Sequence, residues 1–277
     1  MRARWLREAL LLVLAIGAVL AVDFPIAWMP LSSIKEFGDL FSSPPRIVPR
    51  EITFRHYITL FERTGFGTYF VNSTVVALAT VALSLLLSLP AAYALTRYRF
   101  PGREAYARFA LLAYMFPPVF LAIPLFVILV RMRLGNSYVG LVLTHMTFAL
   151  PFSIWLLRAF FRAVPLELEE AAWVDGATQL QGVWHVVLPL SFAGVMATAI
   201  FTAVLSWNDY LFAAILMTTE GKKTLPLAVA LLTSEASSTE WGVIMAAGVL
   251  VTIPAVALFA GMHRYVVQGI GVGALKE

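Results

Sequence analysis

Residues 167–190 read ELEEAAWVDGATQLQGVWHVVLPL, a polar stretch in a chain that is otherwise largely apolar. Of the 277 residues, 60% are hydrophobic and 13% are charged, and the mean hydropathy is +0.84. Soluble domains carry roughly 25% charged and roughly 45–50% apolar residues. The composition therefore predicts a membrane protein, and this stretch is the segment that we expect to lie outside the lipid.

The first half of the stretch is typical of a short helix. Pro165 suits the first helical position, and three glutamates follow in the first turn, where the helix dipole favours anions. Ala171 and Ala172 continue the helix with good helix formers and leave room for the close approach of another backbone. Asp175 and Gly176 end it, because glycine adopts the left-handed stop conformation without strain.

The second half of the stretch predicts another helix that leads into the next apolar segment. Thr178 and Gln181 have the spacing of a capping box, and Pro189 marks the start of the following span. Val174, Ala177 and Leu180 add an apolar surface flanked by acids, which favours a docking element on the membrane surface. The alternative is an amphipathic helix that lies on the headgroups, and the acidic first helix counts against this on an anionic leaflet.

The rest of the chain contains six apolar segments of about 20 residues, the length that crosses roughly 30 Å of hydrocarbon. The first follows three arginines and resembles a signal peptide, but no small-residue cleavage site precedes Pro25, so we expect a retained span. No linker or internal repeat is evident, and we expect residues 1–277 to form a single membrane domain. The expected spans cover about 9–30, 70–95, 109–130, 139–160, 190–217 and 241–262.

The orientation follows from arginines close to the ends of the spans. The segment 97–108, RYRFPGREAYAR, has four arginines, and three more lie among the first seven residues of the chain. Under the positive-inside rule this places both termini in the cytoplasm. Residues 96–108 and 158–189 are then cytoplasmic, whereas 31–69, 131–138 and 218–240 face outward.

The polar stretch also resembles a known motif, E-A-A-x3-G-x9-[I/V]-x-L-P. Glu170, Ala171 and Ala172 are followed at the right distances by Gly176 and by 186–189, VVLP, with valine at the position where isoleucine is commoner. This pattern is the cytoplasmic loop of ABC importer permeases. Further segments are similar to the carbohydrate-uptake branch of that family, of the maltose, trehalose and glycerol-phosphate type: 52–77, 101–126, 148–165, WNDYLFA (207–213) and the glycine-rich tail.

The resemblance implies an all-α, six-span type I importer permease fold in the plasma (inner) membrane. It implies a heterodimer with a second permease subunit, two ATPase subunits that bind ATP and Mg, and an extracytoplasmic sugar-binding protein. We expect no cofactor in this chain itself, since Gly221-Lys222-Lys223-Thr224 lacks the upstream glycine of a phosphate loop. The loop 162–189 would couple the spans to the ATPase through Glu170, Ala171, Ala172, Asp175, Gly176, Leu188 and Pro189.

Polar residues within the spans are candidates for the sugar path, because such groups are costly in lipid and usually face a cavity or a partner. Trp207, Asn208 and Asp209 combine an aromatic face with groups that hydrogen-bond hydroxyls; they line the path or else hold helices together. Asn72 either lines the path or caps its helix. His145 and Asp23 are weaker candidates, and Pro117, Pro118 and Pro124 are expected to break the third span.

Other functions fit the sequence less well. Asp23, Asp209 and His145 in the spans admit a self-sufficient ion-coupled transporter, but no inverted repeat supports one. A polyol or glycerol phosphate remains an alternative substrate, although the spans hold no obvious Arg or Lys for a phosphate, which favours a neutral di- or oligosaccharide. The net charge of +4 and the absence of cysteine give no reason to expect a nucleic-acid partner or a thiol metal site.

Overall fold

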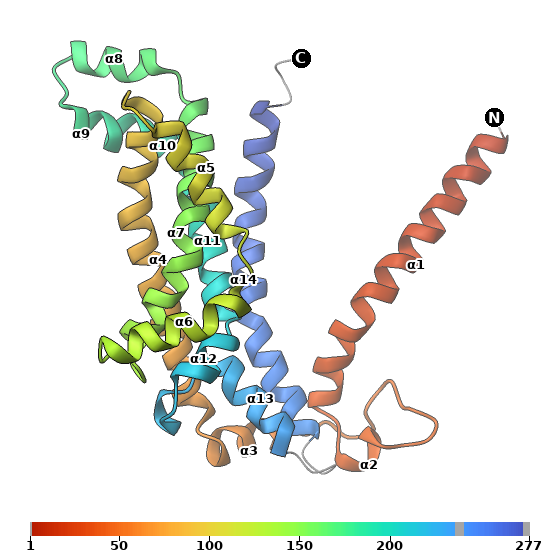
Figure 1. Ribbon diagram of the computed structural model, residues 1–277. Helices are drawn as coiled ribbons and strands as arrows, with labels where there is room; N and C mark the ends of the chain where they lie inside the picture. Colours follow the sequence, from red (N-terminus) through yellow and green to blue (C-terminus); the bar gives the residue numbers. More distant parts are fainter. Residues whose placement is uncertain (1, 236–240, 274–277) are drawn as a thin grey trace. The chain divides into compact units, whose positions relative to one another are not determined.

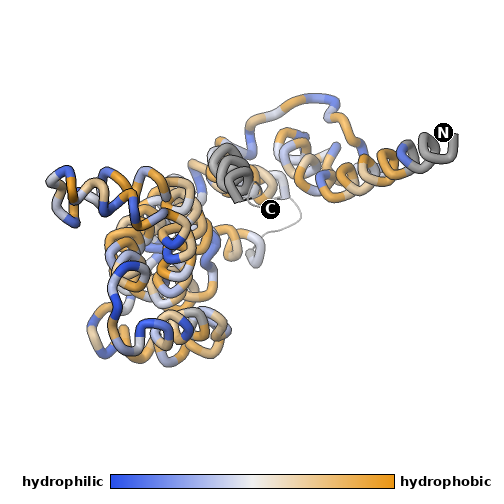
Figure 2. Tube along the Cα trace, turned by 90° about the horizontal axis from the view of Figure 1, so that it is seen from above, coloured by the Kyte–Doolittle hydropathy of each residue, from blue (hydrophilic) through white to orange (hydrophobic). Residues whose placement is uncertain are grey.

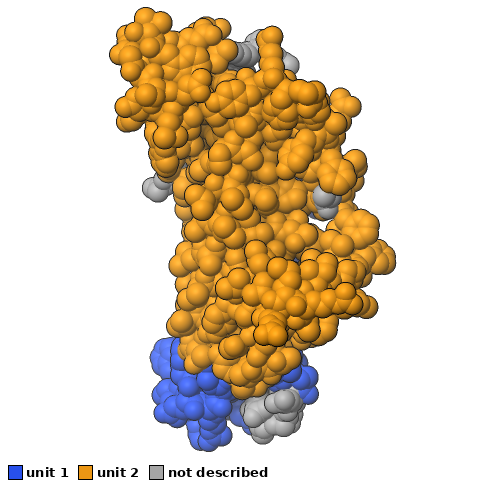
Figure 3. Space-filling model, turned by 60° about the vertical axis from the view of Figure 1, so that its left-hand side comes forward, with its two compact units in different colours: residues 1–66, 229–253 blue, residues 67–228, 254–277 orange. Residues whose placement is uncertain are grey.

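The computed structural model describes residues 2–235 and 241–273, and the regular elements in this part of the chain are helices. The only extended pairing in these residues is an isolated antiparallel bridge between Lys35 and Ile52. The expected all-α membrane fold is confirmed. The chain divides into two compact units, residues 1–66 with 229–253 and residues 67–228 with 254–277 (Figure 3).

Unit 1 begins with α1 (Arg2–Ser33), an apolar helix whose side chains are outward-facing over most of its length. Figure 2 shows hydrophobic residues along most of this helix. The unit also contains α2 (Phe37–Leu40), α3 (Arg55–Arg63) and the first part of α14 (Trp241–Gly273). The helix α14 packs closely on α3, because a Cβ added to Gly242 would lie 2.3 Å from the His56 ring.

The loop around α2 is held by buried polar groups. Asp39 accepts hydrogen bonds from the Arg46 guanidinium at 2.7 Å and from the Arg50 N–H at 2.8 Å. Lys35 is buried, donates to the Arg46 carbonyl at 2.6 Å and lies 4.0 Å from the Trp28 ring centroid. Burial lowers the pKa of Lys35, whereas the backbone hydrogen bond from Arg50 lowers the pKa of Asp39.

Unit 2 holds most of the remaining helices, and Figure 1 shows α4, α7 and α11 beside one another. The segment α8–α10 lies at one end of these helices, which we call the α8 end; α6 and α12 lie at the other, the α12 end. Apart from Phe66, the helices of this unit are α4 (Phe66–Arg97), α5 (Arg103–Tyr114), α6 (Pro118–Arg131), α7 (Tyr138–Ala163), α8 (Leu166–Val174), α9 (Gln179–Gly182), η1 (Val183–Val187), α10 (Leu188–Leu190), α11 (Phe192–Trp207), α12 (Leu211–Leu216) and η2 (Glu220–Lys222). The helix α13 (Leu225–Glu235) is divided, with 225–228 in unit 2 and 229–235 in unit 1, and residues 254–273 of α14 also belong to unit 2.

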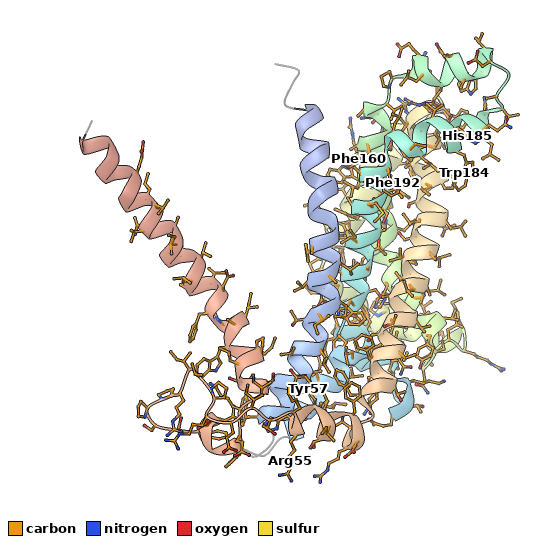
Figure 4. All side chains as sticks on the ribbon, turned by 180° about the vertical axis from the view of Figure 1, so that it is seen from behind. Arg55, Tyr57, Phe160, Trp184, His185 and Phe192 are labelled. Carbon is orange, nitrogen blue, oxygen red and sulfur yellow. The ribbon has the colours of Figure 1, made fainter. Side chains whose placement is uncertain are left out.

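Small residues bring the helices of unit 2 close together. Ser84 of α4 and Ser153 of α7 share a hydrogen bond of 2.9 Å, both fully buried, which satisfies two hydroxyls in an apolar interior. Gly194 of α11 lies against Phe160 of α7, so that an added Cβ would be 2.3 Å from the ring. Figure 4 labels Phe160 next to Phe192, the first residue of α11. Glycine at 194 therefore sets the distance between these two helices.

The six expected segments do not all form uninterrupted helices. Among the residues that the structure describes, four helices are long and apolar enough to cross a membrane: 11–33 of α1, α4, α7 and 241–261 of α14. A bend of 78° between Gln179–Leu190 and Phe192–Trp207 falls at the start of the fifth expected segment, 190–217, and this bent pair would add one span if it is counted together. The same expected segment is interrupted again at 208–210, between α11 and α12. The third expected segment is divided into α5 and α6 at Met115–Pro117, as Pro117 and Pro118 predicted, because proline lacks the N–H that continues a helix. The break expected at Pro124 is absent, since α6 continues through this residue.

Candidate functional site

The segment α8–α9 has most of the local structure that its sequence predicts, although Pro165 is the N-cap of α8 and not its first helical residue. Asp175 caps α8, and Gly176 adopts a φ of +92°, in the left-handed region. Thr178 accepts from the Gln181 N–H at 3.3 Å, and the Gln181 side chain accepts from the Thr178 N–H at 2.7 Å, so the capping box is present. A π-helical turn, η1, then precedes Pro189, which has no N–H for a normal helical bond.

The two glutamates in the middle of α8 point in different directions, since successive helical residues are rotated by about 100°. Glu170 is exposed, whereas Glu169 is fully buried. Tyr93 donates to Glu169 Oε2 at 2.8 Å, and Arg97 Nε donates to Oε1 at 2.6 Å. Arg97 also donates to the Val164 carbonyl at 2.9 Å. One face of α8 is thus fixed on α4, and the other face is open.

The open face of this segment carries large apolar side chains among its polar ones. Val174 is 88% exposed, Leu180 68% and Trp184 61%. In Figure 2 hydrophobic and hydrophilic residues alternate along α8 and α9, and Figure 4 shows Trp184 beside His185 on the segment that follows α9. Exposed apolar residues rimmed by polar ones are typical of a protein docking surface.

The remaining expected coupling residues lie along the same segment. Ala171 and Asp175 are exposed, and Ala172 is half-buried. Leu188 is half-buried and packs against the buried cluster of Ala92, Tyr93, Leu157, Phe161 and Val187, whereas Pro189 is exposed. The open face of α8 therefore includes the exposed motif residues Glu170, Ala171 and Asp175. Leu188, in contrast, packs against side chains of α4 and α7 and helps to hold η1 and α10 on these helices.

A second candidate site is a cavity of about 570 Å³ beside the interruption between α11 and α12. Ligand pockets are typically roughly 300–1,000 Å³, so this volume suits a small oligosaccharide. Asn208, Asp209 and Tyr210 form the interruption and line the cavity; none of the residues that line it is Lys or Arg. The other lining residues are Tyr114, Met115, Phe116, Pro117, Pro118, His145, Phe148, Leu205, Leu211 and Phe212.

Asp209 is held in place by three groups. It accepts from the backbone N–H groups of Phe212 at 3.2 Å and Ala213 at 3.0 Å, which satisfies the free donors at the start of α12. His145 Nε2 lies 3.2 Å from Asp209 Oδ2, and its Nδ1 is 2.9 Å from the Ser206 hydroxyl. The carboxylate and the buried imidazole are thus joined at the cavity wall.

The structure brings only some of the expected path residues to this cavity. Asn208, Asp209 and His145 line it. Trp207 is buried and packs edge-to-face on Phe70, with ring centroids 5.5 Å apart, and it is not among the lining residues. Asn72 is buried within α4, away from the cap position, and its amide donates to the carbonyls of Gly221 and Lys223 at 2.9 Å each.

Several buried contacts were missed from sequence. The pairing of Glu169 with Arg97 joins residues 72 positions apart, and the motif gave weight only to the neighbouring Glu170. The pairing of His145 with Asp209 was also missed, although each residue had been singled out. The sequence did contain one indication of these pairings, namely charged residues at or near the ends of apolar segments. A charged group in such a place usually pairs with another polar group.

Comparison with known proteins agrees with this architecture. Residues 84–272 match the family described as binding-protein-dependent transport system inner membrane component. The chain is 38% identical to the diacetylchitobiose uptake system permease protein DasC of Streptomyces coelicolor, with 95% of each chain covered. It is 35% identical to the trehalose transport system permease protein SugB of Mycobacterium tuberculosis, covering 97% of this chain and 96% of that one.

Two further comparisons cover almost the whole chain. The trehalose/maltose transport system permease protein MalG of Thermococcus litoralis is 32% identical, with 100% of this chain and 99% of the relative covered. A solved bacterial ABC transporter involved in the import of the acidic polysaccharide alginate has the same fold, with a TM-score of 0.83 at 24% identity, covering 96% of this chain and 98% of that chain. The protein belongs to the family of inner-membrane permease components of binding-protein-dependent ABC transport systems.

Proposed function

We propose that this chain is the second permease subunit of an ATP-driven importer for a neutral di- or oligosaccharide. The observation that carries the substrate class is the cavity beside Asn208–Tyr210, which combines hydrogen-bonding groups with aromatic rings such as Tyr114 and Phe116. Sugar hydroxyls bind the first kind of group, and sugar rings stack on the second. A phosphate group is usually bound by a cationic side chain, and the residues that line the cavity include neither Lys nor Arg.

The relatives support the same substrate class. Three of them are named for the transport of diacetylchitobiose, trehalose, and trehalose or maltose, and each covers nearly all of this chain. A solved relative is described in complex with a periplasmic protein that carries an alginate pentasaccharide, which favours a binding-protein partner here as well. The subunit would form its path with a different permease subunit and receive sugar from such a protein.

Transport would be driven by ATP hydrolysis in a separate ATPase subunit that docks on the open face of α8. Glu170, Ala171 and Asp175 are exposed there, next to Val174, which offers apolar area to a partner. Closure of the ATPase would move α8 and shift the subunit between its two access states, so that the cavity opens alternately to each side. In this arrangement α8 lies in the cytoplasm, as do both termini.

Reconstitution tests the transport proposal. The chain is purified with its partner permease, ATPase and binding protein, placed in liposomes, and supplied with labelled trehalose, maltose, diacetylchitobiose or glycerol phosphate. We expect ATP-dependent uptake of a neutral sugar, reduced by Asn208→Ala. Uptake by the chain alone without ATP, or uptake of glycerol phosphate in preference to every sugar, would contradict the proposal.

A charge reversal on α8 tests the docking assignment. Glu170→Lys should abolish the ATP hydrolysis that substrate-loaded binding protein stimulates. Glu167→Lys is the matched control, because Glu167 is also exposed and lies on the same helix outside the motif. Equal effects of the two variants would show that charge on α8, rather than docking at Glu170, matters.

A further inference from the structure

The helix α4 carries a polar clamp at each of its ends. At the α8 end, Tyr93 and Arg97 hold the buried carboxylate of Glu169, as described above. At the α12 end, the side chains of Tyr69, Asn72 and Ser73 hold residues 220–225. We call these two sets of contacts the Glu169 clamp and the Asn72 clamp. Each of them joins α4 to a segment that is distant in sequence.

The Glu169 clamp makes α8 and α4 move together. Glu169 is fully buried, and both of its carboxylate oxygens accept hydrogen bonds from side chains of α4. In addition, Arg97 Nη2 lies 2.5 Å from Glu169 Oε1. Separating these helices would leave a buried carboxylate without its cation, which is strongly unfavourable. Arg97 is also the last residue of α4, where the helix dipole favours a cation.

The Asn72 clamp fixes the outer segment 220–225 on the first turns of α4. Tyr69 donates to Glu220 Oε1 at 2.6 Å, and the Leu225 N–H donates to Ser73 Oγ at 2.7 Å. Asn72 donates to two carbonyls of the segment, which no aliphatic residue could replace. Positions 69, 72 and 73 are three and four residues apart, so their side chains share one face of α4.

The segment beyond the Asn72 clamp leads back to the cavity. Asn136 binds residues 216–222 through five hydrogen bonds, among them those from the N–H groups of Thr218 and Thr219 to its Oδ1, both at 3.2 Å. The segment is continuous with α12 (Leu211–Leu216), whose start is capped by Asp209 at the cavity wall. Movement of residues 217–225 would therefore move α12 and the wall of the cavity.

Between the clamps α4 is a continuous helix. About 20 residues separate Ser73 from Tyr93, which corresponds to about 30 Å at 1.5 Å per residue. The helix is uninterrupted through Pro90, and in its middle Ser84 is bonded to Ser153 of α7. A helix that is fixed at both ends and backed by α7 can transmit displacement along its axis.

We propose that α4 is the strut that couples α8 to the cavity wall, with Arg97, Tyr93 and Asn72 as its positioning residues. The inference rests on the proposed function, because α8 moves only if an ATPase docks on it. It adds the route by which that movement reaches residues 208–210 at the opposite end of unit 2. The two clamps act in series, so loss of either one uncouples the same motion.

A single reporter tests the strut. This chain has no cysteine, so Thr218→Cys, in the segment 216–222 that Asn136 binds, takes a single environment-sensitive fluorophore on this chain. In the full complex with partner permease and ATPase, a non-hydrolysable ATP analogue should change its emission. Asn72→Leu and Tyr93→Phe should each reduce this change, and the binding-protein stimulation of ATPase activity, by about fivefold or more. Thr80→Val is the matched control, because Thr80 is buried on α4 and donates to Val76 of its own helix.

The double variant tests whether the two clamps act on one motion through α4 or whether each substitution acts only on its own surroundings. Asn72→Leu with Tyr93→Phe should uncouple no further than either substitution alone, whereas independent effects would multiply. The proposal is overturned if the reporter does not respond to nucleotide in the otherwise unaltered chain, if either single variant responds fully, or if their effects multiply. A nucleotide response without any sugar uptake would instead overturn the proposed substrate and leave the strut in place.

Discussion

His145 Nε2 of α7 lies 3.2 Å from Asp209 Oδ2, at the interruption between α11 and α12. His145 is buried, whereas the Asp209 side chain is 11% exposed toward the cavity. Since Asp209 also accepts two N–H bonds at the start of α12, one carboxylate joins α7, the cavity and α12. This junction explains why a charged residue is kept inside an apolar segment.

Asp209 has two roles that different substitutions separate. Asp209→Asn keeps an oxygen for the N–H of Phe212, because asparagine caps helices about as well as aspartate. Its amide NH2 faces the N–H of Ala213, which in the unaltered chain donates to the second carboxylate oxygen. We therefore expect a melting temperature between those of the unaltered chain and Asp209→Ala, while sugar uptake falls because the charge beside His145 is lost. Asp209→Ala should lower both, the cap alone costing about 1 kcal/mol of stability.

Thermal unfolding in detergent, together with uptake in liposomes, checks this prediction. Glu167→Gln is the control, since it removes an exposed carboxylate of α8 that neither lines the cavity nor caps α12. Full uptake by Asp209→Asn would mean that the carboxylate serves the fold alone.

The turn between α8 and α9 depends on a glycine. Gly176 has a φ of +92°, a conformation that L residues adopt only with strain. Gly176→Ala should cost roughly 1–2 kcal/mol, while an added Cβ would meet nothing within 4 Å, so the effect is one of backbone strain alone. We expect weaker binding of the ATPase subunit, because α8 and α9 present their surface together.

Affinity of the ATPase for the detergent-purified permease measures this effect. Gly38→Ala serves as the control, because an added Cβ there is also unobstructed and Gly38 does not have a positive φ. Unchanged affinity in Gly176→Ala would show that the turn tolerates a different geometry.

The sequence predicted best what short-range rules control. The capping box at Thr178 and Gln181, the glycine stop at Gly176 and the break before Pro118 all follow from residues within four positions of one another. Each was present where expected. Hydropathy also located the apolar segments, but it could not detect the 78° bend at Ser191, because composition is the same in straight and bent helices.

The long-range contacts could not be predicted from one sequence. Asn72 is separated from its carbonyl partners by 149 and 151 residues, and nothing in its neighbourhood distinguishes a clamp from a path residue or a cap. The role of Trp207 is equally hard to predict from sequence, since its aromatic ring can pack against a sugar or against Phe70. Choosing between such alternatives requires knowing which helices are neighbours, and hydrophobic packing in a membrane leaves little periodic signal.

A third prediction concerns the packing of α11 on α7. A Cβ at position 194 would lie 2.3–2.7 Å from three atoms of Phe160, which is closer than carbon atoms approach. Gly194→Ala should therefore destabilise unit 2 by about 1–3 kcal/mol through overpacking. Adding Phe160→Leu should restore part of the loss.

The melting temperature of each variant in the same detergent decides this prediction. Gly261→Ala on α14 is the control, because an added Cβ there meets nothing within 4 Å. A Gly194→Ala chain as stable as the control would show that the two helices can separate at little cost.

The final prediction concerns Glu104 at the start of α5. Its carboxylate accepts from Arg158 and, at 3.0 Å, from Arg162, and the hydrogen bond from Arg158 lowers its pKa below the ordinary 4.5. A carboxylate with a lowered pKa stabilises the folded chain fully above its ordinary pKa, and this contribution is lost as the pH falls through the lowered value. Glu104→Gln should thus destabilise the protein at neutral pH, because Arg158 is buried and loses its anion.

A pH series of melting temperatures tests the sign. The gap between the unaltered chain and Glu104→Gln should be widest at neutral pH, should close progressively below pH 4.5, and should be gone once the pH has fallen through the lowered pKa of the native carboxyl. Glu167→Gln, at an exposed position of α8, should show no comparable gap at neutral pH. A gap that stays constant with pH would mean that the shape of the side chain, rather than its charge, holds α5 against α7.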